Sequence, residues 1–213
     1  MSMLKRVFFL LLVRPLILFV TGLHIVGREN LPQHIPCIIA ANHNSHMDTL
    51  VLMSLFPLAR LPRVRPVAAA DYFLKNKWVA WFSTQFIGII PISRKATSAH
   101  DSPLAAVNQA LAAGQTIIIF PEGSRGQAET LSPFKTGVAH LAKAFPHIPV
   151  VPVYIDGAGK VLPKGEALFV PFVMDVHIGE PLYYSHKNSQ AFVEQLATRI
   201  QQLRGFTGNE EQS

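Results

Sequence analysis

The 213 residues of this chain are enough for one domain with a sizeable hydrophobic core. Apolar residues make up 49% and charged residues 15%, which is apolar for a soluble protein but too mixed for a protein with several membrane spans. The excess of 19 Lys and Arg over 13 Asp and Glu predicts anionic partners, such as phospholipid headgroups, nucleic acid or an acidic carrier protein. The single cysteine, Cys37, excludes an internal disulfide, and we expect it in the core of a protein from a reducing compartment.

The N-terminal segment is apolar enough to contact a membrane. Lys5 and Arg6 precede an apolar run that extends to Val20 and is interrupted at Arg14. A membrane span needs about 20 residues, so two interpretations stay open: a monotopic anchor with Arg14 reaching lipid phosphates, or a single marginal span. A buried core helix is a third interpretation, but such a helix normally shows a polar stripe, which the first half of the run lacks. We predict a membrane-anchoring segment over residues 1–30.

Beyond this segment, short apolar runs alternate with helical patterns. We expect strands at residues 37–41, 64–70, 88–93, 116–120, 149–155 and 168–178. We expect helices at residues 47–56, 71–82, 103–113, 137–145 and 189–203, with Asp71 as an N-cap and Gly114 as a stop. Pro91 predicts an edge position or an irregular end for its strand. The alternation predicts an α/β fold: one domain (31–204) with a central, largely parallel or mixed sheet flanked by helices, then a polar tail (205–213).

The segment NHNSHMD, residues 42–48, follows a predicted buried strand and begins a predicted helix. Open α/β sheets place their functional sites at the carboxyl ends of strands. His43 and Asp48 are five residues apart, so the carboxylate can hold one imidazole nitrogen while the other takes a proton from a hydroxyl. Ser45, three residues before Asp48, also completes a helix capping box. Taken alone, the segment is equally compatible with a helix cap and with a catalytic pair.

A metal site is a further alternative for this segment. His43, His46 and Asp48 resemble part of a ligand cluster, to which His24 or His34 can be added. The remaining histidines have no carboxylate neighbour at ligand spacing. We therefore predict that the chain holds no metal.

The segment FPEGSRG, residues 120–126, ends another predicted strand and carries Glu122 and Arg125 together at a turn that Gly123 shapes. The Arg125 guanidinium suits a phosphate, which it can bind with two parallel hydrogen bonds. Glu122 can orient Arg125 or accept a hydrogen bond from a substrate hydroxyl. An ordinary polar turn is the plain alternative, because this composition is also good turn chemistry.

Two further cations lie at the ends of predicted elements. Lys135 just precedes a helix, where it can add a point charge for an anion beside the helix N-terminus. Arg94 follows the strand at residues 88–93 and carries a free guanidinium. Each side chain by itself is equally compatible with a solvated surface cation.

These segments, in this order, resemble the glycerolipid acyltransferase family, whose members transfer fatty acyl groups to glycerol-3-phosphate, lysophosphatidic acid and related lysophospholipids. The chain matches four family motifs: Asn-His-x4-Asp at residues 42–48, Gly-x-Ile-x3-Arg at 88–94, Phe-Pro-Glu-Gly-Ser-Arg at 120–125, and Val-Pro-Val at 151–153. Pro91 and Ser93 stand where the family often has an aromatic and an acidic residue, and Asn44 where Gln is frequent. These departures remove no catalytic group, and those in the second motif fall where the family shapes its acceptor pocket.

The resemblance implies acyl transfer from acyl-CoA or acyl carrier protein to the hydroxyl of lysophosphatidic acid, which gives phosphatidic acid in phospholipid biosynthesis. It implies His43 as the general base and Asp48 as the residue that orients it. The substrate-binding residues it implies are Arg94, Glu122, Gly123, Ser124, Arg125 and Lys135. We expect no cofactor, no bound nucleic acid, and a location at the cytoplasmic face of a membrane. The alternatives are a remodelling acyltransferase for another lysolipid or glycerol-3-phosphate, a lipid-binding protein without turnover, and a metal-dependent hydrolase.

Overall fold

A twisted sheet lies at the centre of the computed structural model, which describes residues 2–45, 47–73, 76–93, 103–124, 131–157, 172–185 and 188–207. Within these residues the strand order is β1-β7-β6-β2-β5-β3-β4. The strands are β1 (Thr21–Val26), β2 (Ile38–Ala41), β3 (Val64–Ala69), β4 (Ile90–Ile92), β5 (Thr116–Ile119), β6 (Val150–Asp156) and β7 (Phe172–Ile178). Strand β4 with Pro91 forms one edge, as the sequence predicts.

Strands β6 and β7 pair antiparallel, and all other neighbouring pairs of the sheet are parallel. The carboxyl ends of β2, β3, β5 and β6 therefore meet at one edge of the sheet. The central strands β2 and β5 are buried along their whole length, because helices cover both faces of a parallel sheet. This confirms the predicted α/β fold with a mixed sheet, and it brings the loops after β2 and β5 together.

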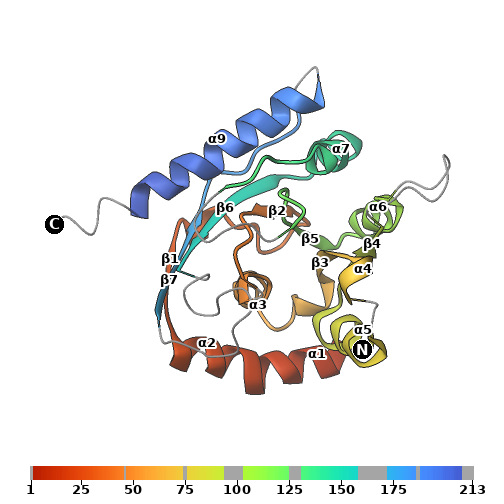
Figure 1. The fold of residues 1–213 in the computed structure, drawn as a ribbon, viewed down its shortest axis with the longest axis vertical. Coiled ribbons are helices and arrows are strands. Elements are labelled where there is room, and N and C mark those ends of the chain that lie inside the picture. The colour runs from red at the N-terminus through yellow and green to blue at the C-terminus, as the bar shows by residue number, and fades with distance from the viewer. Residues whose placement is uncertain are drawn as a thin grey trace.

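Helices cover the two faces of the sheet in separate layers (Figure 1). One layer holds α1 (Ser2–Phe8), the π-helix η1 (Phe9–Val13), α2 (Arg14–Val20) and α3 (Met47–Ser54). The other holds α6 (Ala105–Ala112), α7 (Gly137–Ala144) and α9 (Ser189–Thr207). Near the β4 edge lie α4 (Ala70–Phe73), α5 (Lys77–Phe82) and the π-helix η4 (Ser83–Ile87). The described residues also include two 3₁₀ turns, η2 (Arg28–Asn30) and η3 (Leu61–Arg63).

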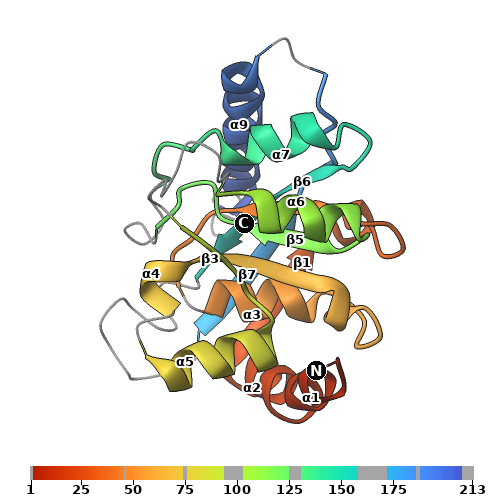
Figure 2. The ribbon, with the colours of Figure 1, turned by 90° about the vertical axis from the view of Figure 1, so that its right-hand side faces the viewer.

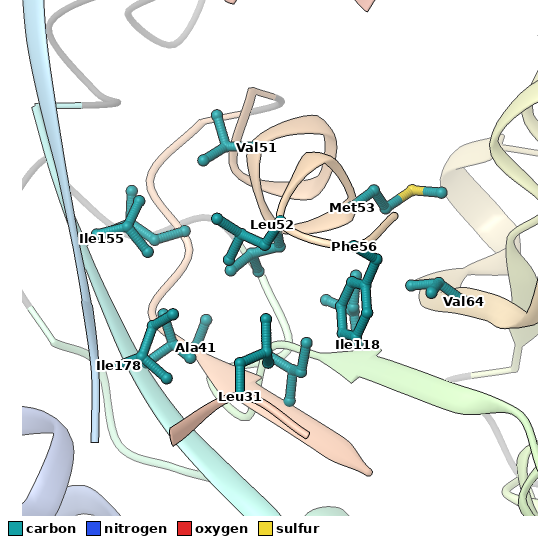
Figure 3. Packing of buried hydrophobic residues seen from close by; sticks show 14 of the residues in the cluster. Leu31, Ala41, Val51, Leu52, Met53, Phe56, Val64, Ile118, Ile155 and Ile178 are labelled. Atoms are coloured by element: carbon teal, nitrogen blue, oxygen red, sulfur yellow. The ribbon is translucent and has the colours of Figure 1, made fainter. Parts of the chain in front are cut away.

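Helix α3 is enclosed between the curved sheet and the N-terminal helices (Figure 1). Its sequence is apolar on nearly every side, which is typical of a buried helix. Leu52 and the following Phe56 point towards the strands, where Ile118 of β5 and Ala41 of β2 meet them (Figure 3). Burial of an aliphatic or aromatic side chain of this size contributes about 1.5–3 kcal/mol. The residues that begin α3 are thus held in a rigid core.

The structure departs from the sequence expectations at three elements. The helix expected at residues 71–82 is two helices, and the N-cap of α5 is Asn76, whose side chain accepts from the Trp78 amide, while Asp71 lies inside α4. Helix α9 continues into the predicted tail as far as Thr207. Strand β1, at residues assigned to the membrane-anchoring segment, was not predicted, and it extends the sheet by pairing parallel to β7.

The N-terminal helical run packs one side on the core and leaves the other exposed. Phe9, Val13 and Ile17 are buried. The expectation that Arg14 reaches lipid phosphates is wrong, because its guanidinium donates to the Phe56 carbonyl at 2.8 Å and turns towards the protein. Lys5 is also buried and donates to the Val64 carbonyl at 2.8 Å. Among the described residues, no helix combines the length and apolar character that a membrane crossing requires.

Candidate active site

The loop between β2 and α3 brings His43 and Asp48 together, as their spacing predicts. His43 Nδ1 lies 2.9 Å from Asp48 Oδ2, and the two side chains are 18% and 1% exposed. Because the ionised carboxylate only accepts, we assign the hydrogen to Nδ1, which leaves Nε2 as the nitrogen that can take a proton. The pair has the base-and-orienter arrangement of a general base that activates a hydroxyl.

The carboxylate of Asp48 also caps helix α3. Its Oδ2 atom accepts from the backbone amides of Asn44 at 2.8 Å and Ser45 at 2.9 Å, and Ser45 Oγ lies 3.3 Å from the Met47 amide. Three donors and the N-terminus of α3 stabilise its negative charge in a buried position. One oxygen atom, Asp48 Oδ2, therefore takes part both in the helix cap and in the pair with His43.

Asn42 fastens the loop to the neighbouring strand. Its side-chain amide donates to the Ile155 carbonyl at 2.8 Å, and its side-chain oxygen accepts from the Ile155 amide at 2.7 Å. Strand β2 ends at Ala41, so the amide continues the ladder to β6 by one more step. This structural role of Asn42 was not predicted from the sequence. The signal for it was the position directly after a strand end, where a primary amide can replace a backbone pair.

Glu122 joins the loop after β5 to the loop that carries His43. One carboxylate oxygen accepts from the His43 backbone amide at 2.9 Å, and the other accepts from the Ser132 amide at 3.0 Å. The residue is 3% exposed. Both oxygens that the sequence analysis offered to Arg125 or to a substrate hydroxyl thus bind backbone amides. In the structure Glu122 therefore holds the backbone of His43.

The ring of Phe120 stacks on the imidazole of His43. The ring centroids are 4.0 Å apart and the planes are inclined by 17°. Phe120 follows the last residue of β5 and packs against the core around α3. The stacking was not predicted from the sequence, where Phe120 is only the first residue of a motif, because nothing in the sequence shows which rings lie in contact.

Gly123 and Lys135 lie in contact beside Glu122. Gly123 has a φ of 74°, and a Cβ atom at that position would lie 2.5 Å from Lys135 Nζ and 2.8 Å from Lys135 Cε. The backbone amide of Lys135 donates to the Pro121 carbonyl at 2.9 Å. The Lys135 side chain therefore lies across the turn, and Ser124 next to it is exposed. Lys135 thus lies against Gly123, the residue that follows Glu122 in the sequence.

Three residues of the sequence analysis lie outside the described residues: Arg94, Arg125 and His46. Within the part of the chain that the structure describes, no three His, Cys, Asp or Glu side chains are grouped so that they can hold a metal ion. His24, considered as an added ligand, instead pairs with Asp175 across β1 and β7 at 3.1 Å.

Comparison with known proteins shows which family the chain is similar to. The acyltransferase family profile matches residues 22–156, which run from β1 to the end of β6 and include His43, Asp48 and Glu122. A chloroplastic 1-acyl-sn-glycerol-3-phosphate acyltransferase of Brassica napus is 30% identical over 163 residues, which are 76% of this chain and 45% of the relative. The 1-acyl-sn-glycerol-3-phosphate acyltransferase alpha of Mus musculus is 29% identical over 161 residues, covering 75% and 54%. The chain thus spans about half the length of these curated relatives.

A solved structure has the same fold. The crystal structure of the 1-acyl-sn-glycerophosphate acyltransferase PlsC from Thermotoga maritima superposes with a TM-score of 0.72 at 22% identity, covering 89% of this chain and 74% of that one. The profile match extends over more than half of the chain and contains the paired His43 and Asp48. The chain belongs to the acyltransferase family.

Proposed function

We propose that this chain is an O-acyltransferase that moves a fatty acyl group from acyl-CoA or acyl carrier protein to the hydroxyl of lysophosphatidic acid, giving phosphatidic acid. The observation that carries the proposal is the 2.9 Å contact between His43 Nδ1 and the buried carboxylate of Asp48. Relatives named 1-acyl-sn-glycerol-3-phosphate acyltransferases support this acceptor.

The reaction follows from the orientation of the imidazole. His43 Nε2 removes the proton from the acceptor hydroxyl as its oxygen attacks the thioester carbonyl carbon. Asp48 stabilises the imidazolium that forms and keeps Nδ1 protonated. When the tetrahedral intermediate collapses, the C–S bond breaks and the thiolate takes the proton back from His43. The products are an ester and a free thiol, and His43 returns to its starting state.

The turn at Gly123 supports the position of the acceptor phosphate. Lys135 lies across this turn against Gly123. The residue before Gly123 is Glu122, whose carboxylate binds the His43 amide. A phosphate held by Lys135 would place a lysolipid headgroup beside the base. We propose that Arg94, Ser124 and Arg125 complete this phosphate site, since a guanidinium binds phosphate with two parallel hydrogen bonds.

We propose that the chain works on a membrane surface, where its acceptor resides. Helices α1 to α2 and helix α5 lie side by side at one end of the molecule (Figures 1 and 2). Edge-to-face contacts of Phe8 with Phe82 and Phe86 join them. Large apolar side chains of both helices are exposed there: Met3, Leu4, Val7, Leu10, Leu11, Leu12, Leu18, Phe19, Trp78, Val79, Trp81 and Phe82. A patch of this kind marks an interaction surface, and Trp residues favour the lipid–water boundary.

The test is transfer of a labelled acyl group to a panel of acceptors, with acyl-CoA and acyl carrier protein as donors. The panel holds lysophosphatidic acid, glycerol-3-phosphate and zwitterionic lysolipids, and we expect lysophosphatidic acid to be the best acceptor. His43→Ala should lower the rate about 100- to 10,000-fold, because it removes the general base. The exposed His140 of α7 gives a matched control, and His140→Ala should leave the rate unchanged.

Each outcome separates the proposed acyl transfer from an alternative. Full activity in His43→Ala would contradict the assigned mechanism. Transfer to another lysolipid but not to lysophosphatidic acid would overturn the acceptor. Saturable lysolipid binding without product, with both donors present, would indicate a lipid-binding protein instead. Loss of activity with a chelator would indicate a metal-dependent reaction.

A further inference from the structure

Two hydrogen bonds and one ring contact bear on the orientation of His43. Asp48 holds Nδ1 of the ring, and Glu122 holds the backbone amide. Neither hydrogen bond prevents the ring from tilting about the line that joins Nδ1 to its acceptor. The third contact is the parallel face of Phe120, 4.0 Å away and inclined by 17°. Because the Phe120 ring lies against the imidazole face, it restricts rotation of the His43 ring about that line.

The stacked geometry also suits the charge that His43 gains during the reaction. An aromatic face attracts a cation placed above it, through the negative charge of its π system. The imidazole becomes a cation when it takes the proton of the acceptor, and it is neutral before and after that step. Phe120 therefore interacts more strongly with the charged state than with the resting state, which is the condition for an effect on rate.

Phe120 is held firmly enough for this role. It directly follows β5, is half-buried, and packs against the core that surrounds α3. The Gly123 amide donates to the Phe120 carbonyl at 2.9 Å, so the turn after β5 also fixes its backbone. The ring and the base thus approach each other from the ends of two neighbouring parallel strands, β5 and β2.

We propose that Phe120 is a positioning residue for acyl transfer, which holds the plane of the His43 imidazole and stabilises the imidazolium formed when His43 takes the acceptor proton. The proposal rests on the proposed function. In this proposal Phe120 contacts the face of the His43 ring, Asp48 binds Nδ1 at its edge, and Glu122 binds the His43 backbone amide. Phe120 touches neither the donor nor the acceptor in this assignment, so its effect falls on turnover and not on binding.

The kinetic test compares Phe120→Leu, which keeps an apolar side chain without a ring, with Phe120→Tyr, which keeps the ring. We expect Phe120→Leu to lower kcat about 3- to 30-fold, the range of a cation–π contact, with KM for both substrates within about twofold. Phe120→Tyr should retain kcat. Phe145 contacts His147 with a centroid distance of 6.4 Å, so Phe145→Leu makes the same change at another Phe–His contact and should leave kcat unchanged.

A second measurement does not depend on turnover or on any Phe120 variant. In the wild-type chain, the stack should move the ring-proton resonances of His43 upfield by ring current, and His43→Ala identifies those resonances by their loss. Unshifted His43 protons would overturn the inference. So would an unchanged kcat in Phe120→Leu, or an equal loss of kcat in Phe120→Leu and Phe120→Tyr. Absence of acyl transfer in the wild-type chain with every donor and acceptor would instead remove the proposed function, and this inference with it.

Discussion

At the scale of single residues, His43, the proposed base, is held by hydrogen bonds to side chains that also serve the local fold. Oδ2 of Asp48 binds the imidazole of His43 and two backbone amides, so a change at Asp48 alters the catalytic pair and the start of α3 together. Glu122 binds the backbone amide of His43. Asn42, the residue before His43, binds the backbone of Ile155. Loss of a buried partner of this kind leaves an unsatisfied group that costs about 1–3 kcal/mol. The precision of the site thus depends on ordinary buried hydrogen bonds.

The pairing of His43 with Asp48 was predictable because only five positions separate His43, in the loop after β2, from Asp48, in the first turn of α3. The partners of Asn42 and Glu122 were not. Asn42 binds a backbone 113 residues away, and Glu122 binds one 79 residues away. Backbone amides are the same at every position, so no letter of the sequence marks them as partners. The side-chain identities showed which groups can accept or donate, and the strand order decided which groups they meet.

Gly123 gives a test at the residue scale. In Gly123→Ala, the added Cβ atom would collide with the Lys135 side chain. The alanine would also have to adopt a φ of 74°, which L-residues disfavour. We expect KM for lysophosphatidic acid to rise about 10-fold, the cost of one charged contact to phosphate, with a smaller change in kcat. Steady-state kinetics with varied acceptor measures both constants.

The matched control for this variant is Gly114→Ala. Gly114 has a similar φ of 70°, but a Cβ atom there meets nothing within 4 Å. Both variants should lose about 1 kcal/mol of unfolding free energy through the same backbone strain. Only Gly123→Ala should change KM. An equal KM in the two variants would show that Lys135 does not hold the acceptor.

At the scale of elements, the apolar pattern predicted the central strands and the long helices and failed at the boundaries of the sheet. Strands β2 and β5 are buried on both faces, so their sequences are continuous apolar runs that stand out. Strand β1 directly follows an apolar helix, and its six residues merge with that run in any measure of hydrophobicity. Its identity depends on β7, which lies some 150 positions later in the chain and pairs with it.

The docking of helix α1 has a pH dependence that follows from Lys5. Burial, and then the neighbouring Arg65 guanidinium, lowers the pKa of Lys5 from 10.5 to about 7. The amine is 4% exposed and donates to the Val64 carbonyl. Between pH 7 and 10.5 the folded chain therefore binds fewer protons at this site than the unfolded chain does. Its contribution to the unfolding free energy rises with pH across that window and is constant below it.

We expect the unfolding free energy of the wild type, relative to Lys5→Met, to increase by about 2 kcal/mol from pH 7 to pH 9. Urea unfolding of both proteins at several pH values measures this difference. The range ends at pH 9 because burial raises the pKa of the Cys37 thiol to about 12, so the unfolding free energy of both proteins falls at higher pH. Lys143→Met supplies the control, since it makes the same substitution at an exposed lysine of α7. A flat difference for Lys5→Met would show that the Lys5 amine is solvated.

At the scale of the whole molecule, the apolar side chains are distributed in a way that the core does not require. The run from α1 to α2 buries Phe9, Val13 and Ile17 on one side and exposes Leu11 and Phe19 on the other. Helix α5 adds Trp78 and Trp81 to the same end of the molecule (Figure 2). A formal net charge of +6 would add attraction to an anionic surface. This end of the molecule is therefore the surface that we propose for membrane contact.

Membrane contact through this end predicts how the molecule partitions onto vesicles. The double variant Leu11→Asp, Phe19→Asp places two negative charges on the exposed face of the N-terminal helical run, where neither residue supports the core. Each change removes buried apolar area worth about 1.5–3 kcal/mol at the lipid boundary, if the residue is fully inserted. We therefore expect partitioning onto phosphatidylcholine–phosphatidylglycerol vesicles to fall at least 10-fold, measured by co-sedimentation. Acyl transfer to a short-chain, water-soluble acceptor should be unchanged, because the base and its partners are untouched.

Charge alone also lowers binding to an anionic vesicle, so the comparison needs a variant with added charge elsewhere. Tyr183 is exposed, large and distant in sequence from both helices, and Tyr183→Asp adds one of the same charges outside the patch. Binding in this control should fall only by the small factor that one screened surface charge contributes. On vesicles of phosphatidylcholine alone the control should match the wild type, while the double variant stays weak. If the double variant and the control partition equally on both vesicles, charge holds the chain at the membrane and the apolar helices do not.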